Sequence, residues 1–156
     1  MNTSNLTFSS HNQASEISRE LIESIGLIDR DYFPWPWTHE FWCVFLDSRN
    51  FQLEVVTDQD TVIGFALFEI FADDSLAHLY KIVVYDAYRE CGAALRLHSS
   101  ATNNLFKINR IYLEVSIQNH KAIRFYERLG YKTIVVKKNF YADGNDALAM
   151  ELQTSK

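Results

Sequence analysis

The sequence predicts an α/β fold in which helices cover a mixed β-sheet. Segments near the N-terminus and between residues 92 and 129 place apolar residues at helical spacing. Segments between residues 51 and 84, and between residues 132 and 152, are rich in β-branched and aromatic residues and are divided by short polar turns. The resulting order is helix, helix, three strands, helix, strand, helix, two strands, which suits a sheet with helices packed on it.

The first two predicted elements are helices separated by a loop. Helical spacing of apolar residues predicts a helix from Asn12 to Ile25, which Gly26 would end. The stretch from Tyr32 to Trp37 contains both prolines of the chain, so we expect a loop there. Thr38 can then cap a short helix that runs through Leu46.

Strands and helices follow in alternation. Gly130 stands where a glycine commonly caps the C-terminus of a helix. The predicted strands are Phe51–Thr57, Thr61–Phe71, Leu76–Val84, Ile111–Val115, Lys132–Lys138 and Ala147–Leu152, and the predicted helices are Gly92–Phe106 and His120–Leu129.

Length and composition indicate a single globular domain over residues 1–156. The chain is large enough to bury a core, and 47% hydrophobic with 22% charged residues is ordinary for a globular protein. We find no membrane span or signal-peptide pattern, which predicts a cytoplasmic protein that does not bind membranes. Cys43 and Cys91 form no CxxC pair, so neither a disulfide nor a zinc site is expected.

The charge balance bears on the class of partner. A net charge of −5 argues against nucleic acid, because proteins that bind phosphate backbones concentrate lysine and arginine. An acidic surface would tolerate or attract a basic substrate. The five histidines show no metal-ligand spacing, so no metal is expected. The sequence does not indicate the oligomeric state.

The junction between the strand Leu76–Val84 and the helix that opens at Gly92 suits a phosphate group. A strand that leads through a short loop into a helix aims unpaired backbone N–H groups outward, with the helix dipole behind them. Gly92 and the small Ala94 would let a pyrophosphate approach the main chain. A tight turn without a ligand explains the stretch equally well, because short glycine-containing turns are weak motifs.

Four blocks, in order along the chain, resemble the GNAT superfamily of N-acetyltransferases. Pro36-Trp37-Thr38 is similar to the Pro-Trp-Ser sequence of its N-terminal acetyltransferases. Arg89-x-x-Gly92-x-Ala94 resembles its acetyl-CoA pyrophosphate loop, with alanine where glycine is commonest. The second conserved block is matched by Leu113-Glu114-Val115, Asn119 and the stretch from Ala122 to Tyr131, and the closing hairpin by Lys138 to Tyr141 with Asp146, Ala147 and Met150.

This resemblance implies the GNAT fold, a single twisted, mixed, mostly antiparallel sheet of about six or seven strands flanked by four helices. It also implies acetyl-CoA as acetyl donor. Asn119 can also be simply the N-cap of its helix, and Cys91 can be a variable loop position or a reactive thiol. The residues implied to bind acetyl-CoA are Ile82, Val83, Val84, Arg89, Glu90, Cys91, Gly92, Ala93, Ala94 and Asn119.

Two residues are implied to be catalytic. Strand alternation places Tyr112 and Glu114 on the face opposite the apolar residues. A carboxylate in a covered sheet is costly to ionise, so we expect a raised pKa for Glu114, as a general base needs; the alternative is a glutamate in solvent. Tyr126 fits a core aromatic on its helix, whereas the resemblance makes its phenol the acid that protonates the CoA thiolate.

The implied acceptor is the N-terminal α-amine of a protein, as in the branch that acetylates ribosomal proteins. Such an amine, with a pKa of about 8, needs less help to lose its proton than a lysine of about 10.4. It would lie between Trp37 and the pair Phe140 and Tyr141, although the stretch Trp35 to Trp37 can instead fill the core. Direct attack in a ternary complex is expected. Acetylation of lysines or small amines, and a non-catalytic acetyl-CoA-binding regulatory module, remain alternatives.

Overall fold

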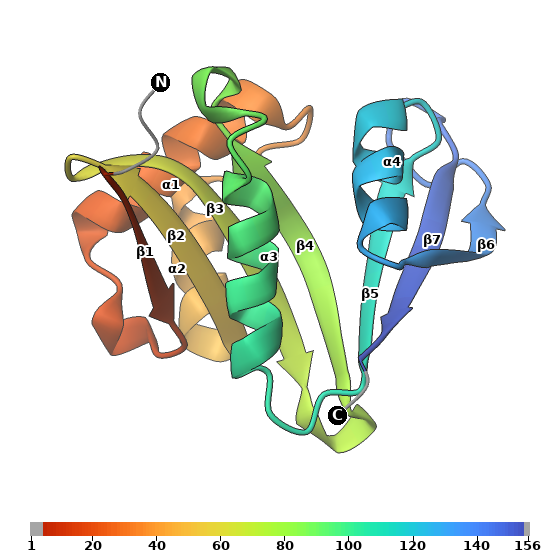
Figure 1. Cartoon of the computed structure of the whole chain (residues 1–156), viewed down its shortest axis with the longest axis horizontal. Coiled ribbons are helices and arrows are strands. Elements are labelled where there is room, and N and C mark those ends of the chain that lie inside the picture. Colours follow the sequence, from red (N-terminus) through yellow and green to blue (C-terminus); the bar gives the residue numbers. More distant parts are fainter. Residues whose placement is uncertain (1–4, 155–156) are drawn as a thin grey trace. The chain divides into compact units, whose positions relative to one another are not determined.

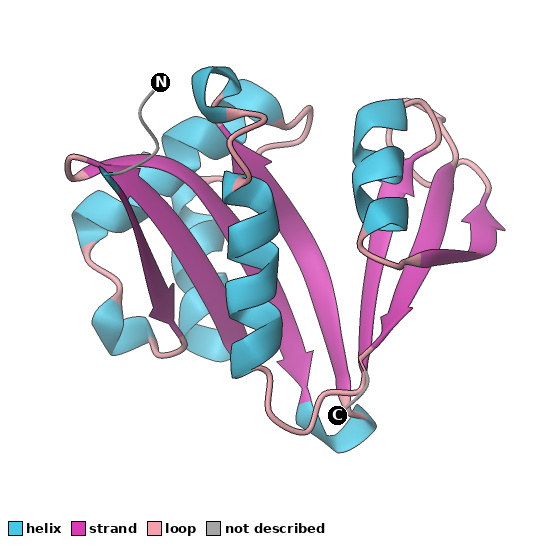
Figure 2. Cartoon of the chain, viewed as in Figure 1, coloured by secondary structure: helices cyan, strands magenta, loops and turns pink. Residues whose placement is uncertain are grey.

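A computed structural model describes residues 5–154. Over this range, seven strands form one mixed sheet in the order β1-β2-β3-β4-β5-β7-β6, and four α-helices accompany it (Figure 2). β4 and β5 run parallel where they pair, whereas β1–β2, β2–β3, β5–β7 and β7–β6 are antiparallel. The mixed sheet with four helices confirms the predicted fold class.

The chain forms two compact units. The first contains the described residues up to Ile70 together with Lys81–Phe106, and the second contains Phe71–Tyr80 and the residues from Lys107 onward. The first unit is built from β1 (Leu6–His11), α1 (Arg19–Tyr32), α2 (His39–Ser48), β2 (Phe51–Asp58), β3 (Thr61–Phe71) and α3 (Ala93–Asn104). The second is built from β5 (Arg110–Ser116), α4 (His120–Arg128), β6 (Lys132–Lys137) and β7 (Ala147–Gln153), and β4 (Leu76–Val84) contributes residues to both.

The first helix differs from the prediction. α1 begins at Arg19, where the Ser18 hydroxyl accepts a hydrogen bond from the Leu21 N–H at 3.1 Å. It then continues through Gly26 to Tyr32, so the predicted helix Asn12–Ile25 was wrong at both ends. A glycine inside a helix costs only about 1 kcal/mol. Burial of the neighbouring Ile25 and Ile28 outweighs that cost.

Strand β1 was not predicted at all. Leu6–His11 pairs antiparallel with β2 over its full length. Its sequence is largely polar and its side chains are mostly exposed or half-buried, so it lacks the apolar pattern that marks a strand. The remaining predicted helices and strands are confirmed, with ends that agree to within two residues. Thr38 caps α2 as expected, because its hydroxyl accepts from the Phe41 N–H at 3.1 Å.

The core of the first unit lies between its sheet and the helices α1 and α2. In Figure 1 these two helices lie on one face of β1–β3 and α3 on the other. β2 is buried along most of its length, as expected for a strand covered on both faces. The buried residues of the cluster are Ile25, Ile28, Trp42, Phe45, Leu46, Phe51, Leu53, Val55, Phe65, Leu67 and Val83.

Gly64 allows a close approach between β3 and β4. A Cβ at this position would lie 2.6 Å from the Val83 carbonyl oxygen and 3.0 Å from the Val84 Cα. No side chain larger than hydrogen fits there without moving β4, because both contacts are with backbone. The glycine therefore fixes how the end of β4 lies against β3.

The second unit positions one helix beside three strands. In β5 the residues Ile111, Leu113 and Val115 are buried, and the residues between them are half-buried, which confirms the predicted alternation. α4 ends at Arg128, and Gly130, with a φ of 94°, takes the left-handed position just after the C-cap, as predicted. Within residues 5–154, no helix combines the length and apolar character that crossing a membrane requires.

Candidate active site

The loop after β4 is anchored by two tyrosines. It contains a short 3-10 turn, Asp86–Tyr88. The Tyr88 hydroxyl donates to Asp58 at 2.6 Å, and the Asp86 N–H donates to the Tyr32 hydroxyl at 3.1 Å. These bonds fix the loop to the β2–β3 turn and to the end of α1, so its backbone is held in place.

Gly92 opens α3 in a conformation that suits an anion. Its φ is 80°, which a side chain would strain, and a Cβ built there would meet no atom within 4 Å. The backbone angle favours glycine, and a side chain there would meet open space. The N–H groups of the first turn of α3, which begins at Ala93, have no partner within the helix. This geometry fits the pyrophosphate predicted for residues 89–94.

The other predicted cofactor residues surround this loop in different ways. Arg89 forms an ion pair with Asp86 at 2.8 Å and lies over the Tyr32 ring. The Cys91 thiol donates to the Tyr88 carbonyl at 2.7 Å, so it stabilises the loop. Glu90 and Gly92 are exposed, Ile82, Cys91 and Ala94 are half-buried, and Val83, Val84 and Ala93 are buried. Binding of acetyl-CoA by these residues stays a prediction.

The Glu114 carboxylate lies at the centre of a polar cluster in the second unit. Its Oε2 is 2.8 Å from His78 Nε2 on β4. Its Oε1 accepts from the Tyr112 hydroxyl at 2.8 Å and from Lys137 Nζ on β6 at 2.6 Å. The side chain is 12% exposed, so it does not point freely into solvent. Both oxygens therefore have protein donors.

These donors reverse the pKa shift expected from the sequence. Burial by itself raises the pKa of Glu114, as predicted. The hydrogen bonds from His78 and Lys137, the charge of His78 and the Tyr112 hydroxyl outweigh burial and lower this pKa to about 2. The expectation of a raised pKa was wrong, and Glu114 is an ionised carboxylate at neutral pH.

Sequence reasoning missed His78 and Lys137 as members of this cluster. The parallel register pairs His78 with Tyr112, so the imidazole stacks near the tyrosines of both strands, 4.2 Å from the Tyr80 ring and 5.2 Å from the Tyr112 ring. The sequence did contain a signal, a histidine within an otherwise mostly apolar strand. Without the strand order, however, the sequence could not show that His78 pairs with Tyr112.

Tyr126 is buried on α4, as the core interpretation predicted. Its ring lies 5.5 Å from both the Phe125 and Tyr131 rings. Burial, and then the nearby Tyr141, raise its pKa well above the ordinary value, so the phenol keeps its proton at neutral pH. Asn119 is the N-cap of α4, because its side-chain oxygen accepts from the Ala122 N–H at 3.1 Å. Their roles toward acetyl-CoA stay predictions.

Trp37 is part of an aromatic cluster held by a buried ion pair. Its ring lies 4.7 Å from both the Phe41 and Trp42 rings. Asp29, fully buried, accepts from the Trp37 backbone N–H at 2.8 Å and from the Trp42 indole at 3.2 Å, and pairs with Lys81 Nζ at 2.5 Å. Trp37 is half-buried and packs against the core, whereas Trp35 is 41% exposed, so the core interpretation holds for Trp37 only in part and a contact with substrate stays a prediction.

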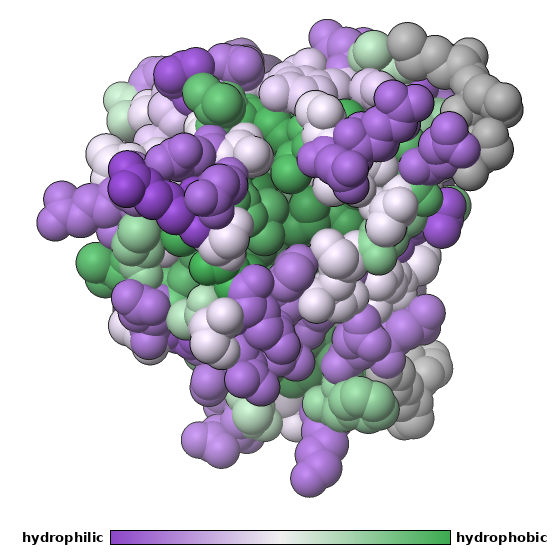
Figure 3. All heavy atoms as spheres, turned by 90° about the vertical axis from the view of Figure 1, so that its left-hand side faces the viewer, coloured by the Kyte–Doolittle hydropathy of each residue, from purple (hydrophilic) through white to green (hydrophobic). Residues whose placement is uncertain are grey.

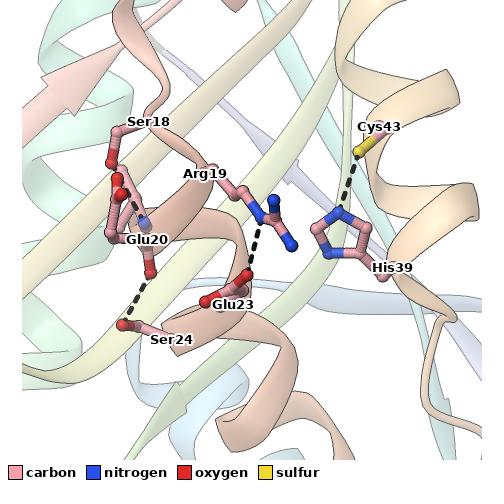
Figure 4. Close-up of polar contacts among 8 residues, drawn as sticks. Ser18, Arg19, Glu20, Glu23, Ser24, His39 and Cys43 are labelled. Atoms are coloured by element: carbon pink, nitrogen blue, oxygen red, sulfur yellow. Dashed lines mark hydrogen bonds and ion pairs between the residues drawn. The ribbon is translucent and has the colours of Figure 1, made fainter.

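The same tryptophan also lines a pocket between α1 and α2. The pocket has a volume of about 520 Å³ and is lined by Ile22, Glu23, Gly26, Leu27, Arg30, Pro36, Trp37, Thr38 and His39. Figure 4 shows Arg19 and Glu23 of α1, paired at 2.9 Å, near His39 and Cys43 of α2, whose ring nitrogen and sulfur are 3.6 Å apart. Figure 3 shows apolar surface gathered in a hollow on the face of the first unit seen from the left of Figure 1.

The hairpin between β6 and β7 carries Phe140 and Tyr141. Their rings lie 5.1 Å apart at 90°. Phe140 is exposed, and the burial of Tyr141 raises the pKa of its phenol. The structure therefore brings Glu114, Tyr126, Asn119, Phe140 and Tyr141 into the second unit. The loop 89–94 and Trp37 belong to the first unit.

Comparison with protein families decides the relationship. A model of the "Acetyltransferase (GNAT) family" matches residues 22–131, which include the phosphate-binding loop, Glu114 and Tyr126. The chain belongs to the acetyltransferase (GNAT) family. The match contains residues of both compact units and most of the blocks that carried the resemblance.

Individual relatives of this GNAT chain include archaeal and bacterial proteins. The N-alpha-acetyltransferase of Sulfurisphaera tokodaii is 37% identical over 76 residues, which cover 47% of this chain and 46% of that protein. The chain thus spans about half the length of this archaeal relative. The [ribosomal protein bS18]-alanine N-acetyltransferase of Escherichia coli strain K12 is 30% identical over 135 residues, 82% of this chain and 88% of that protein.

Solved structures show the same fold. The ribosomal-protein-S18-alanine N-acetyltransferase from Escherichia coli has a TM-score of 0.80 at 22% identity, with 96% of each chain covered. Arabidopsis thaliana NAA60 in complex with a bisubstrate analogue has a TM-score of 0.79 at 20% identity, covering 94% of this chain and 98% of that one.

Within residues 5–154 of this GNAT chain, no group of three His, Cys, Asp or Glu residues is arranged to hold a metal ion.

Proposed function

We propose that this chain is an acetyl-CoA-dependent N-acetyltransferase whose acceptor is the N-terminal α-amine of a protein. The observation that carries the proposal is the Glu114 cluster, an ionised carboxylate beside aromatic rings in a chain of the GNAT family. Such a site suits a cationic amine. Residues 1–156 would form one catalytic domain.

The first unit would hold the donor. Acetyl-CoA, when bound, supplies an activated acetyl group on a thioester. The N–H groups at the start of α3, beside Gly92, would bind its pyrophosphate, because no side chain caps this helix start and a Cβ at Gly92 would meet no atom within 4 Å. The main chain of Ile82 to Val84 would pair with the pantetheine amides. A hydrogen bond from Asn119 to the pantetheine arm, implied by the family resemblance, would come from the second unit.

Proton handling would fall to the second unit. An acceptor ammonium must lose a proton before its nitrogen can attack. Glu114, with a pKa of about 2, is a good anionic partner for that ammonium and a weak base by itself. We assign the general-base role to Glu114, which would take the proton through a water, while His78 holds its carboxylate by a hydrogen bond.

Tyr126 would act as the general acid. Its phenol is protonated at neutral pH, although burial raises its pKa and so makes it a weaker acid than an ordinary tyrosine. Attack by the neutral amine in a ternary complex would form the C–N bond and break the C–S bond. Tyr126 would give its proton to the CoA sulfur, and the proton lost by the new amide nitrogen would restore it. No covalent intermediate on the protein is needed in this scheme.

The acceptor class is supported by named relatives. The matched proteins include enzymes named for N-alpha-acetylation and for acetylation of ribosomal protein bS18. A ribosomal acceptor would place this enzyme in the cytoplasm. An α-ammonium group also loses its proton more readily than a lysine does, so a weak base such as Glu114, with its low pKa, suffices for it.

The deciding experiment measures free CoA thiol released by the purified protein from acetyl-CoA. One peptide carries a free N-terminal alanine and no lysine, and the other a blocked N-terminus and one internal lysine. We expect release with the first peptide only. Release with the second alone would assign the enzyme to lysine acetylation. CoA release with small amines but with neither peptide would indicate a small-molecule acceptor. No CoA release with any acceptor would favour a non-catalytic binding module.

A further inference from the structure

The ammonium of Lys137 occupies a cation site built by three other residues. Its Nζ lies 2.6 Å from Glu114 Oε1, 5.3 Å from the centre of the Tyr112 ring and 5.0 Å from the centre of the Phe140 ring. A carboxylate together with two aromatic faces is the arrangement that proteins use to bind an ammonium group. The chain's own lysine thus fills a site of the kind that an amine substrate needs.

The neighbouring lysine shows that this arrangement is specific to position 137. Lys138 Nζ pairs with Asp146 at 2.8 Å, and its side chain is 77% exposed. Lys137 is the last residue of β6, and Lys138 begins the turn that follows. Of these two adjacent lysines, Lys137 is the one that pairs with Glu114.

Lys137 is also the donor to Glu114 that can leave most easily. Its side chain is 36% exposed, compared with 20% for His78. It belongs to β6, the edge strand of the sheet, and its long flexible stem can carry the ammonium into water. The other titratable groups that face Glu114 are His78, Tyr112 and Tyr141.

We propose that Lys137 is an internal stand-in for the acceptor ammonium and is displaced from Glu114 when an acceptor binds. The proposal rests on the function assigned above and names the residue that sets acceptor affinity. An acceptor must carry a positive charge to replace Lys137, so a blocked or neutral N-terminus would leave the lysine in place. Lys137 is in this sense a built-in competitor of the acceptor.

The test compares the variants Lys137→Met, Lys137→Arg and Lys138→Met with the parent. Methionine keeps the length of the stem and removes the charge. We expect Lys137→Met to lower the KM for the alanine peptide by about two- to fivefold, as loss of a partly exposed ion pair allows, and to leave the KM for acetyl-CoA unchanged. Lys137→Arg and Lys138→Met should keep the parental KM for peptide.

A second readout does not depend on turnover. Alaninamide, a small cationic amine, is titrated against each protein while the His78 and Tyr112 side-chain resonances are followed by NMR. It should bind Lys137→Met more tightly than the parent or Lys138→Met. If the parent releases no CoA with any acceptor, the proposed function fails, and this titration alone then decides whether Lys137 occupies a cation site.

Several outcomes would overturn the inference. Equal alaninamide affinity in the parent and in Lys137→Met would show that the lysine does not compete for the site. A peptide KM that rises in Lys137→Met would mean that the lysine assists acceptor binding, and an unchanged KM would mean that it has no effect on acceptor binding. The same fall in KM for Lys138→Met would point to a general effect of charge on the surface. Circular dichroism of each variant checks that the fold is retained.

Discussion

At the scale of single residues, the chemistry depends on how donors surround one carboxylate. Glu114 would be a weaker acid if burial acted alone, and three side chains make it a stronger one. An ionised Glu114 can bind cations over the whole physiological pH range. Its contribution to the reaction should therefore not depend on pH.

Glu114→Gln tests this directly. We expect turnover to fall about a hundredfold, a typical effect of losing a general acid or base, and by the same factor at every pH between about 6 and 9. The uniform loss follows because a carboxyl with a pKa of about 2 does not titrate in that range. The measurement is the pH–rate profile of CoA release. A loss confined to the acidic end would mean that Glu114 titrates near neutrality after all.

Tyr126→Phe isolates the proposed acid. Phenylalanine keeps the ring contacts with Phe125 and Tyr131, so the variant should fold like the parent. Turnover should drop about ten- to hundredfold because the thiolate leaves without a proton. Affinity for acetyl-CoA should be unchanged by calorimetry. A variant as fast as the parent would remove Tyr126 from the mechanism.

The sequence placed Glu114 on the correct face of β5, because alternation is a local property. It failed on the pKa because the deciding donors come from far along the chain, His78 from β4 and Lys137 from β6. Only the strand order brings these side chains together. The effect of burial on the pKa of Glu114 was correctly anticipated, and the compensating hydrogen bonds were not.

At the scale of elements, two glycines with open space around them should respond in opposite ways to replacement by alanine. Neither Gly26 nor Gly92 would bring a Cβ within 4 Å of another atom. Gly26 lies inside α1, where alanine is the better helix former, whereas Gly92 holds a φ of 80° that alanine strains. Space alone therefore does not predict the effect of a substitution.

Replacing each glycine with alanine should separate the two effects. Gly26→Ala should stabilise the protein by about 0.5–1 kcal/mol in urea denaturation. Gly92→Ala should destabilise it by about 1 kcal/mol and weaken acetyl-CoA binding in calorimetry, because the start of α3 must shift. Normal cofactor affinity in Gly92→Ala would separate this helix start from the cofactor site.

The sequence predicted element types better than their limits. Gly130 ended α4 as expected because its φ of 94° disfavours other residues, but Gly26 did not end α1, because packing of the helix overrode a weak local preference. Strand β1 escaped detection because its exposed side chains carry no apolar pattern. The ends of helices and strands, and the presence of an edge strand such as β1, depend on tertiary contacts that the periodicity of apolar residues does not reveal.

At the scale of the whole molecule, a buried ion pair links segments distant in sequence. Asp29 of α1 and Lys81 of β4 are almost fully buried, and the same carboxylate holds the backbone of Trp37 and the indole of Trp42. Burial, opposed by Asp29, lowers the pKa of Lys81. The pair thus ties α1, the loop before α2 and β4 into one unit.

Breaking this pair should be costly, and replacing it should cost less. Asp29→Asn or Lys81→Met alone should destabilise the protein by about 3–5 kcal/mol, because each leaves an unpaired buried group. The double variant should recover a large part of that loss. Urea midpoints measure both effects. Additive losses in the double variant would show that the two residues contribute independently.

Gly64 has a consequence for how this chain can vary. It takes no part in chemistry, yet its missing side chain lets β3 press against Val83 and Val84. A single methyl group there would move the strand end that leads into the phosphate-binding loop. In a scan of all substitutions scored by activity, position 64 should tolerate as few residues as Glu114. In a ranking of positions by mutational tolerance, Gly64, which matters only for packing, would then stand beside residues such as Glu114 that matter for chemistry.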